Sequence, residues 1–370
     1  MKRLLVVIDS LGYGGAERLL LTTLAHLDRS RFHPLVASLF GPSPLAGPIR
    51  DLGVRVVELG LSGPKDLPRA VAGLRSLVET HAPDLVHTHL FASNVAGRVA
   101  VRGRVPVITT LHNPDYGQEG PGRGFGMRRL LDGSTAHLWA PTFLAVSDEV
   151  RRDYREHLAL RDVRVLHNYL DLDDFDRRFD SVPRGEVRRR LSVGADHFML
   201  LHVGRFHRQK AQDVLIRAFA GLAPSDPALR LTLVGEGPGR GEAESLVQRL
   251  GVGDRVRFPG TVEDPEVLYA AADAFVFPSR YEAFGMALLE SMAAGLPAVV
   301  SAVGGILELS TSATALRVPP DDPQALAGAI ARLRADPRLA SDMGMAARAR
   351  ATQFDATSAV SRLEGVYVDA

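Results

Sequence analysis

Two cations follow a short apolar run in the second half of the chain. The segment HVGRFHRQKAQDVLI (202–216) reads as a strand end, a turn and a helix start, with Arg205 and Lys210 flanking the turn. Two cations and the N-terminal end of a helix can together hold a diphosphate. A Walker loop is excluded, because the chain contains no G-x-x-x-x-G-K-[ST] pattern. Taken alone, the two cations are also explained as a solvated helix start.

A pair of carboxylates follows a later apolar run. In PSRYEAFGMALLESMAAGLP (278–297), Glu282 precedes a predicted helix and Glu290 lies within it. The backbone amides of residues 284–286 open that helix and could bind a phosphate or sugar oxygen. Eight helical residues rise about 12 Å, a span that suits one carboxylate on sugar hydroxyls and the other on a ribose. The alternative for Glu290 is a partly buried helix carboxylate with a structural partner.

A glycine-rich turn lies directly after the first apolar run. In SLGYGGAER (10–18), Gly12, Gly14 and Gly15 would let backbone amides approach an anion at a helix start. The dinucleotide fingerprint G-x-G-x-x-G fails, because Glu17 stands at the last glycine position. A dehydrogenase is therefore poorly supported, and a tight strand-to-helix turn remains the structural alternative.

These turns require strands and helices that bring them together. Short apolar runs predict strands at 4–9, 34–39, 54–58, 84–88, 106–110, 142–146 and 163–166, and again at 198–203, 229–234, 255–258, 274–277, 298–301 and 315–318. Amphipathic stretches alternate with them, at 16–28 and near 209–222, 240–250, 265–272, 285–294, 323–335, 340–351 and 355–366. Repeated βα units imply parallel sheets covered by helices. We therefore predict an α/β chain with two doubly wound, Rossmann-like domains that face each other across a cleft, the first spanning 1–168 and the second 198–352. The charged stretch 171–197 reads as a linker plus a short helix, within a junction over 169–197.

Composition narrows the function. The chain has 370 residues, no cysteine and a net charge of only +1, which argues against thiolate chemistry and a dedicated nucleic-acid binder. No apolar run reaches the roughly 18 residues of a membrane-spanning helix, and the N-terminus lacks the pattern of a signal peptide. The expected location is the cytoplasm. Residues 1–170 carry 21 basic against 16 acidic side chains, whereas 171–370 carry 23 against 27, which either favours an anionic partner for the first half or reflects drift.

Five segments together resemble glycosyltransferase family 4. They are GGAER, GRFHRQK, LVGEGPGR, VRFPG, and EAFGMALLESMAAGLPAVVS followed by VGG. The resemblance is strong over about 198–310 and implies the GT-B architecture, retention of anomeric configuration, and a last helix (353–370) that crosses back to the first domain. The run HNYLDLDDF (167–175) is similar to the family's domain junction, although Tyr169 stands where glycine is usual. Asp171-Leu172-Asp173 in this junction is a chance match to the metal-binding D-x-D motif of the other glycosyltransferase architecture.

The resemblance also implies roles for individual residues. Arg205 and Lys210 hold the donor pyrophosphate without a metal or other cofactor, Glu290 binds the ribose, and Glu282 contacts the donor sugar. His112, which ends the strand VITTLH, matches the family's histidine beside the reacting sugar. The full set expected to bind the donor is Gly14, Gly15, Gly204, Arg205, Lys210, Gly235, Glu282, Phe284, Gly285, Met286 and Glu290. His89 is a weaker candidate for an acceptor contact.

The predicted activity is transfer of a hexose-type sugar from a nucleotide-diphosphate donor, with UDP favoured over GDP. The acceptor is unidentified and could be lipid-linked, a polysaccharide or a small molecule. The alternatives are a GT-B epimerase or hydrolase acting on a UDP-sugar, and a nucleotide-binding module without catalysis. Tight nucleotide binding without turnover would favour the module.

One glycine-rich segment bears on the acceptor. PDYGQEGPGRGFGMRRLLDG (114–133) combines six glycines with Arg123, Phe125, Met127, Arg128 and Arg129. Glycine predicts a mobile loop, and arginines beside apolar side chains suit an anionic headgroup layer. We therefore expect either peripheral contact with the inner face of a membrane, with Arg123, Arg128 and Arg129 taking part, or a flexible loop that binds a soluble acceptor.

Overall fold

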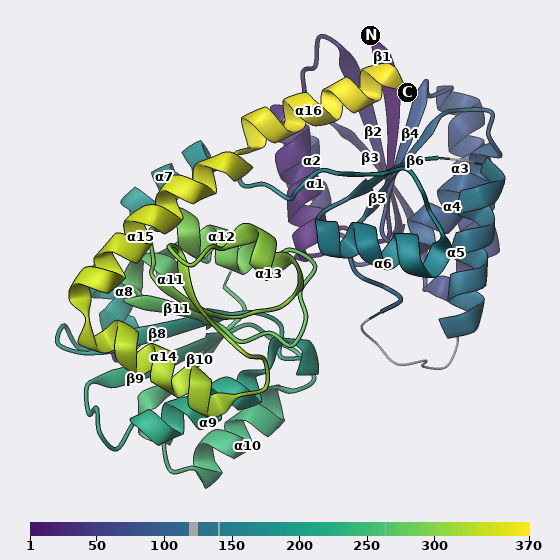
Figure 1. The fold of residues 1–370 in the computed structure, drawn as a ribbon. Helices are drawn as coiled ribbons and strands as arrows, with labels where there is room; N and C mark the ends of the chain where they lie inside the picture. The colour runs from purple at the N-terminus through teal and green to yellow at the C-terminus, as the bar shows by residue number, and fades with distance from the viewer. Residues whose placement is uncertain (118–124, 140, 263) are drawn as a thin grey trace. The chain divides into compact units, whose positions relative to one another are not determined.

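The chain folds into two compact units. A computed structural model describes residues 1–117, 125–139, 141–262 and 264–370. Unit 1 consists of Met1–Tyr169 together with Ala356–Ala370, and unit 2 consists of Leu170–Asp355 (Figure 1). Each unit has its own parallel sheet, as the two series of βα units predict.

Unit 1 is built on a seven-stranded parallel sheet in the order β3-β2-β1-β4-β5-β6-β7. Its strands are β1 (Lys2–Ile8), β2 (Phe32–Phe40), β3 (Arg55–Leu61), β4 (Leu85–His89), β5 (Val107–Leu111), β6 (Thr142–Ala145) and β7 (Val163–Val165). The strand order reverses between β1 and β4. Ligands of doubly wound sheets bind at such a switch point, beyond the carboxyl ends of the strands.

Helices cover both faces of this sheet. They are α1 (Gly15–His26), α2 (Ala46–Asp51), η1 (Pro64–Asp66), α3 (Leu67–His81), α4 (Phe91–Val101), α5 (Phe125–Trp139) and α6 (Asp148–Leu158). One hydrophobic cluster joins β1, β2 and β4 to α3 and α4, and another joins the opposite side of β1 and β2 to α1 and α2. Strands buried on both faces read as continuous apolar runs, which explains why their positions follow from the sequence.

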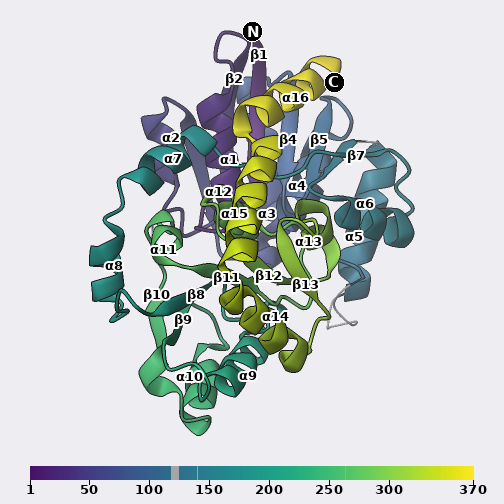
Figure 2. The ribbon, with the colours of Figure 1, turned by 60° about the vertical axis from the view of Figure 1, so that its left-hand side comes forward.

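The C-terminal helix α16 (Ala356–Asp369) belongs to unit 1, and the two chain termini lie side by side (Figures 1 and 2). The ammonium group of Lys2 donates to the carbonyl of Tyr367 at 2.8 Å. The carboxylate of Glu364 accepts from the amide of Asp28 at 2.8 Å and pairs with Arg31 at 3.1 Å. These contacts fix α16 beside the N-terminal strand, although the two segments are far apart in sequence.

Unit 2 contains a six-stranded parallel sheet in the order β10-β9-β8-β11-β12-β13. Its strands are β8 (Phe198–Val203), β9 (Leu229–Val234), β10 (Val256–Gly260), β11 (Ala274–Phe277), β12 (Ala298–Ser301) and β13 (Ala315–Val318). Its helices are α7 (Leu172–Asp180), α8 (Arg184–Arg190), η2 (Arg208–Lys210), α9 (Gln212–Leu222), α10 (Arg240–Arg249), η3 (Gly253–Arg255), α11 (Glu266–Ala271), α12 (Met286–Ala293), α13 (Gly304–Leu309), α14 (Pro323–Ala335), α15 (Pro337–Ala351) and η4 (Thr352–Phe354). The order reverses between β8 and β11, so this sheet also has one switch point.

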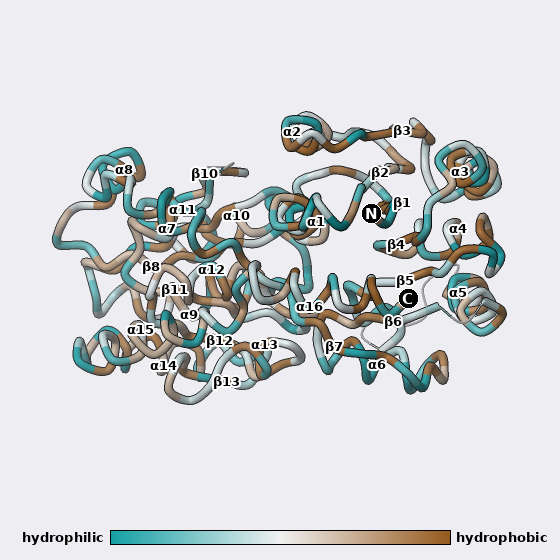
Figure 3. The backbone as a smooth tube through the Cα atoms, turned by 90° about the horizontal axis from the view of Figure 1, so that it is seen from above, coloured by the Kyte–Doolittle hydropathy of each residue, from teal (hydrophilic) through white to brown (hydrophobic). Residues whose placement is uncertain are grey.

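The charged segment 171–197 differs from its prediction as a linker with one short helix. It forms two helices, α7 and α8, which pack on α11 in unit 2. The tube of α8 is hydrophilic for most of its length (Figure 3). Arg188 is nevertheless buried, because its guanidinium donates to the carbonyls of Ala271, Gly194 and His197 and pairs with Asp273. A buried arginine with this many partners cannot be recognised from the sequence alone.

The prediction of a loop over all of 114–133 is wrong in its second half. Residues 118–124, including Arg123, lie outside the described residues, but Phe125–Trp139 forms the helix α5. The reason is a buried ion pair: Asp132 of α5 lies 2.7 Å from Arg98 of α4, with 1% and 0% of their side chains exposed. Tyr116 also donates to Asp132 at 2.7 Å. These long-range contacts hold α5 against α4 despite its two glycines.

Candidate active site

The switch point of unit 2 brings together two turns that the sequence singled out. The turn after β8 carries Gly204, Arg205 and, through the short helix η2, Lys210. The turn after β11 carries Glu282. Because β8 and β11 are neighbours in the sheet, residues about 70 positions apart meet at its carboxyl edge.

Lys210 and Glu282 form an ion pair at this edge. The ammonium nitrogen of Lys210 lies 2.5 Å from Oε2 of Glu282, and only 16% and 10% of the two side chains are exposed. Lys210 also lies over the ring of Phe277, 5.0 Å from its centroid, and Ser279 donates to Glu282 at 3.3 Å. A charge held this way in a partly buried site is oriented before any ligand arrives, which is what stabilisation of a developing anion requires.

Backbone hydrogen bonds tie the two turns together. The amide of Arg280 donates to the carbonyl of Gln209 at 2.8 Å, and the side-chain amide of Gln209 donates to the carbonyl of Tyr281 at 3.2 Å. The guanidinium of Arg280 reaches back to Asp213 in α9 at 2.9 Å. The relative position of Lys210 and Glu282 is therefore fixed by the backbone as well as by their own charges.

Arg205 lies in the same turn with an exposed side chain. Among the residues that the structure describes, its guanidinium has no carboxylate partner. Its backbone is held by Gln212, whose side-chain amide donates to the Arg205 carbonyl at 2.9 Å. Arg205 thus offers an uncommitted positive charge near the paired Lys210.

The glycines Gly204 and Gly235 serve the close approach of two turns. A Cβ atom added at Gly235 would lie 2.3 Å from the carbonyl oxygen of Gly204, and Gly235 has a φ of +128°. A side chain at Gly204 would lie 3.4 Å from Cγ of Lys210. The two glycines, both expected at the donor site, therefore allow the β8 turn to pack against the β9 turn.

The start of α12 carries the next group of expected donor residues. Gly285 caps the helix with a left-handed φ of +100°, and no side chain caps the amides that follow at Met286 and beyond. Phe284 is fully buried and packs edge-on against Phe354, so its side chain belongs to the core. Glu290 lies in the second turn of α12. Its Oε2 accepts a hydrogen bond from the hydroxyl of Tyr269 at 2.8 Å.

In unit 1, the glycine turn before α1 contains a buried carboxylate. Gly14 is the N-cap of α1 and Gly15 its first residue. Glu17 lies so close that a Cβ atom at Gly14 would be 2.3 Å from its Oε2. Burial raises the pKa of Glu17, although Ser10 donates to it at 3.2 Å. An anion approaching this turn would therefore have to displace the Glu17 side chain or meet it protonated.

His112 and His89 lie at the carboxyl ends of β5 and β4. Nε2 of His112 is 3.0 Å from Nδ1 of His89, and both imidazoles are largely buried. Burial lowers the pKa of His112 to about 4 and that of His89 well below its usual range. Both rings are therefore neutral near pH 7, so one donates to the other.

A cavity of about 300 Å³ opens beside His112, wholly within unit 1. Its lining includes Asp9, Asn94, His112, Asp115 and Arg128. Arg128 is paired with Asp115 at 2.8 Å, and its guanidinium lies 4.3 Å from the ring centroid of Phe91. The structure thus brings Arg128 together with His112, whereas His89 reaches the site only through its contact with His112.

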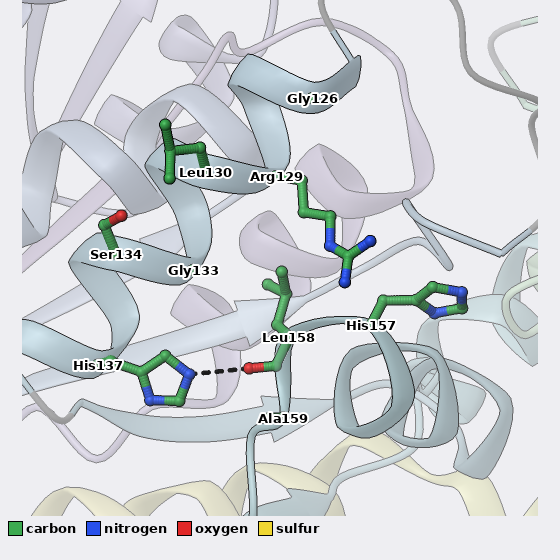
Figure 4. A pocket seen from close by; sticks show the side chains of 9 residues that line it. All are labelled: Gly126, Arg129, Leu130, Gly133, Ser134, His137, His157, Leu158 and Ala159. Carbon is green, nitrogen blue, oxygen red and sulfur yellow. Dashed lines mark hydrogen bonds between the residues drawn. The ribbon is translucent and has the colours of Figure 1, made fainter.

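Arg129 does not line this cavity. It borders a separate hollow between α5 and the end of α6, with Gly126, Leu130, His157 and Leu158 (Figure 4). The predicted cluster of three arginines is therefore divided, with Arg128 turned to the His112 cavity and Arg129 to another surface.

Sequence reasoning missed several residues of the His112 cavity. Asp9 directly follows β1 at the switch point, and that position alone could have identified it. No sequence motif marks Asn94 or Asp115. Asn94 lies in α4 and Asp115 follows Asn113-Pro114, and the two residues become neighbours only in the folded unit. Across the described residues, no three His, Asp or Glu side chains converge in a way that could hold a metal ion.

Two doubly wound units with a cationic turn at a switch point are the architecture of GT-B glycosyltransferases, and solved structures agree. HepE from Anabaena, solved with UDP and glucose, superposes with a TM-score of 0.87 at 23% identity, covering 100% of both chains. Sucrose-phosphate synthase from Thermosynechococcus elongatus gives a TM-score of 0.84 at 25% identity, covering 100% of this chain and 99% of the other.

Sequence comparison identifies the family. Residues 183–350 match the glycosyl transferases group 1, and residues 13–174 match glycosyltransferase family 4. The D-inositol 3-phosphate glycosyltransferase of Thermomonospora curvata is 33% identical over 357 residues, covering 88% of this chain and 80% of the relative. The enzyme of the same name from Streptomyces bingchenggensis is 32% identical, covering 83% and 72%. The chain therefore belongs to the group 1 glycosyltransferases, and it is a transferase.

No helix among the described residues is long and apolar enough to span a bilayer.

Proposed function

We propose that this enzyme transfers a hexose-type sugar from UDP to a hydroxyl group, with retention of configuration and without a divalent metal. The observation that carries the proposal is the ion pair of Lys210 and Glu282 beside the uncommitted Arg205 at the switch point of unit 2. UDP is favoured over GDP because HepE, a structural neighbour, was solved with UDP and with UDP-glucose.

The leaving group is the first problem that the site must solve. When the bond between the sugar C1 and the diphosphate oxygen breaks, negative charge builds up on that oxygen. Arg205, Lys210 and the uncapped amides at the start of α12 supply positive charge of the kind that stabilises such an anion. Two side-chain cations fill the part that Mg²⁺ or Mn²⁺ takes in metal-dependent enzymes.

Glu282 has two roles in this proposal. It orients the Lys210 ammonium through one carboxylate oxygen, and the other oxygen accepts a hydrogen bond from a hydroxyl of the donor sugar. Glu290 is proposed to accept hydrogen bonds from the ribose, in addition to the one that it accepts from Tyr269. Because Glu282 is committed to Lys210, the two-carboxylate scheme of retaining glycosidases does not fit. We propose instead a same-face displacement: the acceptor oxygen bonds to C1 as the phosphate oxygen leaves, and that phosphate oxygen takes the acceptor proton.

The acceptor is proposed to bind in the cavity beside His112, where the neutral imidazole can accept or donate one hydrogen bond. Two relatives are named for transfer to D-inositol 3-phosphate, a phosphorylated ring with several hydroxyls. A polyhydroxylated acceptor is thus the chemical class that those names support.

The acceptor could also be presented on a lipid, and we propose that α5 then contacts an anionic membrane at the cytoplasmic face. Met127, Leu130 and Leu138 expose 61%, 62% and 69% of their surfaces, and Arg129 lies among them. Each basic residue near an anionic surface adds about 1 kcal/mol. Co-sedimentation with anionic but not neutral vesicles, reduced in Arg129→Ser, would support this contact. A lack of binding at low salt would leave a soluble acceptor.

The test of the activity is a thermal-shift screen of UDP-, GDP- and ADP-sugars, followed by turnover of the stabilising donor with and without acceptors. We expect UDP-sugars to stabilise the protein and UDP to appear only with an acceptor, in a product that keeps the donor's anomeric configuration by NMR. Equal release of free sugar and UDP without any acceptor would favour the epimerase or hydrolase. Binding without turnover would favour a nucleotide-binding module.

A further inference from the structure

The cavity beside His112 lies at the switch point of unit 1. Its lining includes Asp9, which follows β1, and Leu90 and Asn94, which follow β4. These two strands are neighbours where the strand order reverses. The cavity, of about 300 Å³, is therefore where a doubly wound sheet places a ligand.

The helix end that could attract an anion here is already occupied. The Asp9 carboxylate accepts hydrogen bonds from the backbone amides of Ala92 and Ser93, at 3.3 Å and 2.7 Å, at the start of α4. Helix N-termini bind anions through such amides. In this unit the protein's own carboxylate fills that position, so the helix offers little to a phosphate group.

The cation in the lining is also engaged. The Arg128 guanidinium lies 2.8 Å from Oδ2 of Asp115, and the hydroxyl of Tyr154 donates to the same oxygen at 3.0 Å. The ring of Phe91 lies under the guanidinium. A bound phosphate would have to separate Arg128 from Asp115 and leave a partly buried carboxylate without its charge partner, which is costly.

The charges of the described lining residues are unfavourable for an anion. Two carboxylates, Asp9 and Asp115, face one guanidinium, and His112 is neutral near pH 7 because burial lowers its pKa. Even with Arg128 released, a phosphate would approach two acidic side chains. Like-charge juxtaposition of this kind is a common way to reject a competing ligand.

Unsatisfied polar atoms point to hydroxyl groups. Asn94 lines the cavity with 2% of its surface exposed, and its Oδ1 has no hydrogen-bond partner. Nε of Arg128 is likewise buried without a partner. Buried polar atoms are normally paired, so one acceptor and one donor await a ligand. A hydroxyl group can donate to Asn94 and accept from Arg128.

We propose that this cavity binds a neutral polyhydroxylated acceptor and that Asp115 is the residue that excludes phosphorylated ones by holding Arg128. The inference rests on the proposed glycosyl transfer and names its acceptor class. It sets this enzyme apart from the relatives named for inositol 3-phosphate. If Asp115 no longer engages Arg128, the guanidinium becomes available and the cavity loses one negative charge.

The first experiment uses inorganic phosphate as the probe, with saturating UDP present to fill the donor site. We expect the wild-type enzyme to bind inorganic phosphate at least about tenfold more weakly than the Asp115→Asn variant in isothermal titration calorimetry, a difference of about 1.4 kcal/mol or more. Asp115→Asn, which is nearly isosteric, should bind phosphate at low millimolar concentration. The double variant Asp115→Asn/Arg128→Gln should lose that binding.

Asp84→Asn is the matched control. Asp84 also pairs with an arginine, Arg3, at 3.0 Å, but 51% of the Arg3 side chain and 41% of the Asp84 side chain are exposed, and the pair lies on another part of unit 1. This variant should bind no more phosphate than wild type. Arg128-dependent phosphate binding by the wild-type enzyme would overturn the proposal. So would a folded Asp115→Asn enzyme, verified by its UDP affinity and thermal melt, that gains no phosphate binding.

The second experiment compares matched acceptors with UDP-glucose as donor: myo-inositol against D-myo-inositol 3-phosphate, and glucose against glucose 6-phosphate. The neutral member of each pair should be the better acceptor by about tenfold or more, and Asp115→Asn should narrow that ratio. Equal or faster transfer to the phosphorylated members would refute the inference while leaving the proposed transfer intact. If no acceptor reacts and UDP does not bind, the proposed function itself fails, and the phosphate titration without UDP still decides the role of Asp115.

Discussion

Nδ1 of His89 lies 3.0 Å from Nε2 of His112. On the other side, the ring of His89 lies against that of His87, with centroids 4.1 Å apart, and His87 bonds Tyr367 at 2.7 Å and Thr110 at 2.8 Å. A neutral imidazole carries one proton, so the direction of the hydrogen bond between His89 and His112 decides which nitrogen of His112 is protonated. His89 is therefore a positioning residue for His112 rather than a separate acceptor contact.

The positioning role predicts that two substitutions at His89 affect kcat to different extents. His89→Leu cannot hydrogen-bond His112 and should lower kcat by about tenfold, less than the ~10²-fold that removal of an acid–base group itself costs, with the KM for UDP-sugar unchanged. His89→Gln keeps a polar atom near His112 and should recover most of that loss. Steady-state kinetics over pH 5.5–8 provide the check. In the wild type no acid limb should appear near pH 6.5, because burial lowers the pKa of His112 to about 4. Equal kcat in both variants would remove the positioning role.

The paired cations of unit 2 predict a loss of transition-state stabilisation. Arg205→Ala and Lys210→Ala should each lower kcat by ~10²-fold or more, as when a group that stabilises a developing anion is removed. Arg217→Ala is the control, because Arg217 is an exposed arginine of α9 in the same unit. UDP release with a working acceptor is the measurement. Wild-type turnover in both site variants would mean that the diphosphate is held elsewhere.

Metal independence can be checked directly. If Arg205 and Lys210 neutralise the leaving group, dialysis against EDTA should leave at least half of the activity, because no ion is needed as a Lewis acid. Added Mg²⁺ or Mn²⁺ should change the rate by less than about twofold. Loss of activity in EDTA that Mn²⁺ restores would contradict the proposed role of the two cations.

The strands and the donor-side turns could be predicted because their signals are local. Central strands such as β1 and β11 are apolar runs that are buried on both faces, and Arg205, Lys210 and Glu282 lie in the turns that follow such strands. The ion pair between Lys210 and Glu282 could not be predicted from spacing. It depends on β8 and β11 being neighbours, which is a property of the strand order.

The acceptor side was harder to predict because its contacts are long-range. Six glycines outweighed the helical signal in 114–133, and the buried pair of Arg98 and Asp132 that stabilises α5 has no counterpart in the local sequence. The sequence predicts Arg128 as a surface cation, but contacts with Asp115 and Phe91 hold its side chain at the cavity beside His112. Neither partner lies at a helical spacing from Arg128, so no periodicity could reveal them.

The buried pair of Arg98 and Asp132 predicts a large effect on stability. Asp132→Ala removes the carboxylate and leaves the Arg98 charge buried, which typically costs about 3–5 kcal/mol in the free energy of unfolding. Asp84→Ala breaks the exposed pair with Arg3 and should lower the free energy of unfolding far less, because water and salt screen an exposed ion pair. Urea unfolding followed by the fluorescence of the single tryptophan, Trp139 in α5, reports on unit 1. Equal midpoints for the two variants would show that Arg98 finds another partner or reaches water.

The buried histidines predict acid sensitivity of unit 1. Burial lowers the pKa of His87 to about 3 and of His112 to about 4, and it lowers that of His89 as well. Unfolding restores ordinary pKa values near 6.5. Below pH 6.5 the unfolded chain therefore binds protons that the native unit does not, so stability is full above pH 6.5 and falls as the pH decreases toward 4. At pH 5.5 His87 and His112 each cost about 1.4 kcal/mol relative to pH 7.5, roughly 3 kcal/mol together, and His89 acts in the same direction.

A single substitution isolates this contribution from the carboxylates that titrate in the same range. His87→Gln should lower stability at pH 7.5, because it disturbs the bonds to Tyr367 and Thr110. Its further loss between pH 7.5 and 5.5 should be smaller than that of the wild type by about 1.4 kcal/mol, since one proton-binding group is gone. His33→Gln, at an exposed position of β2, serves as control. Urea unfolding of all three proteins at both pH values gives the comparison. If the His87→Gln variant loses as much stability between pH 7.5 and 5.5 as the wild type does, His87 is already protonated in the native unit. That result would contradict the structure, in which His87 is buried and bonded to Tyr367 and Thr110.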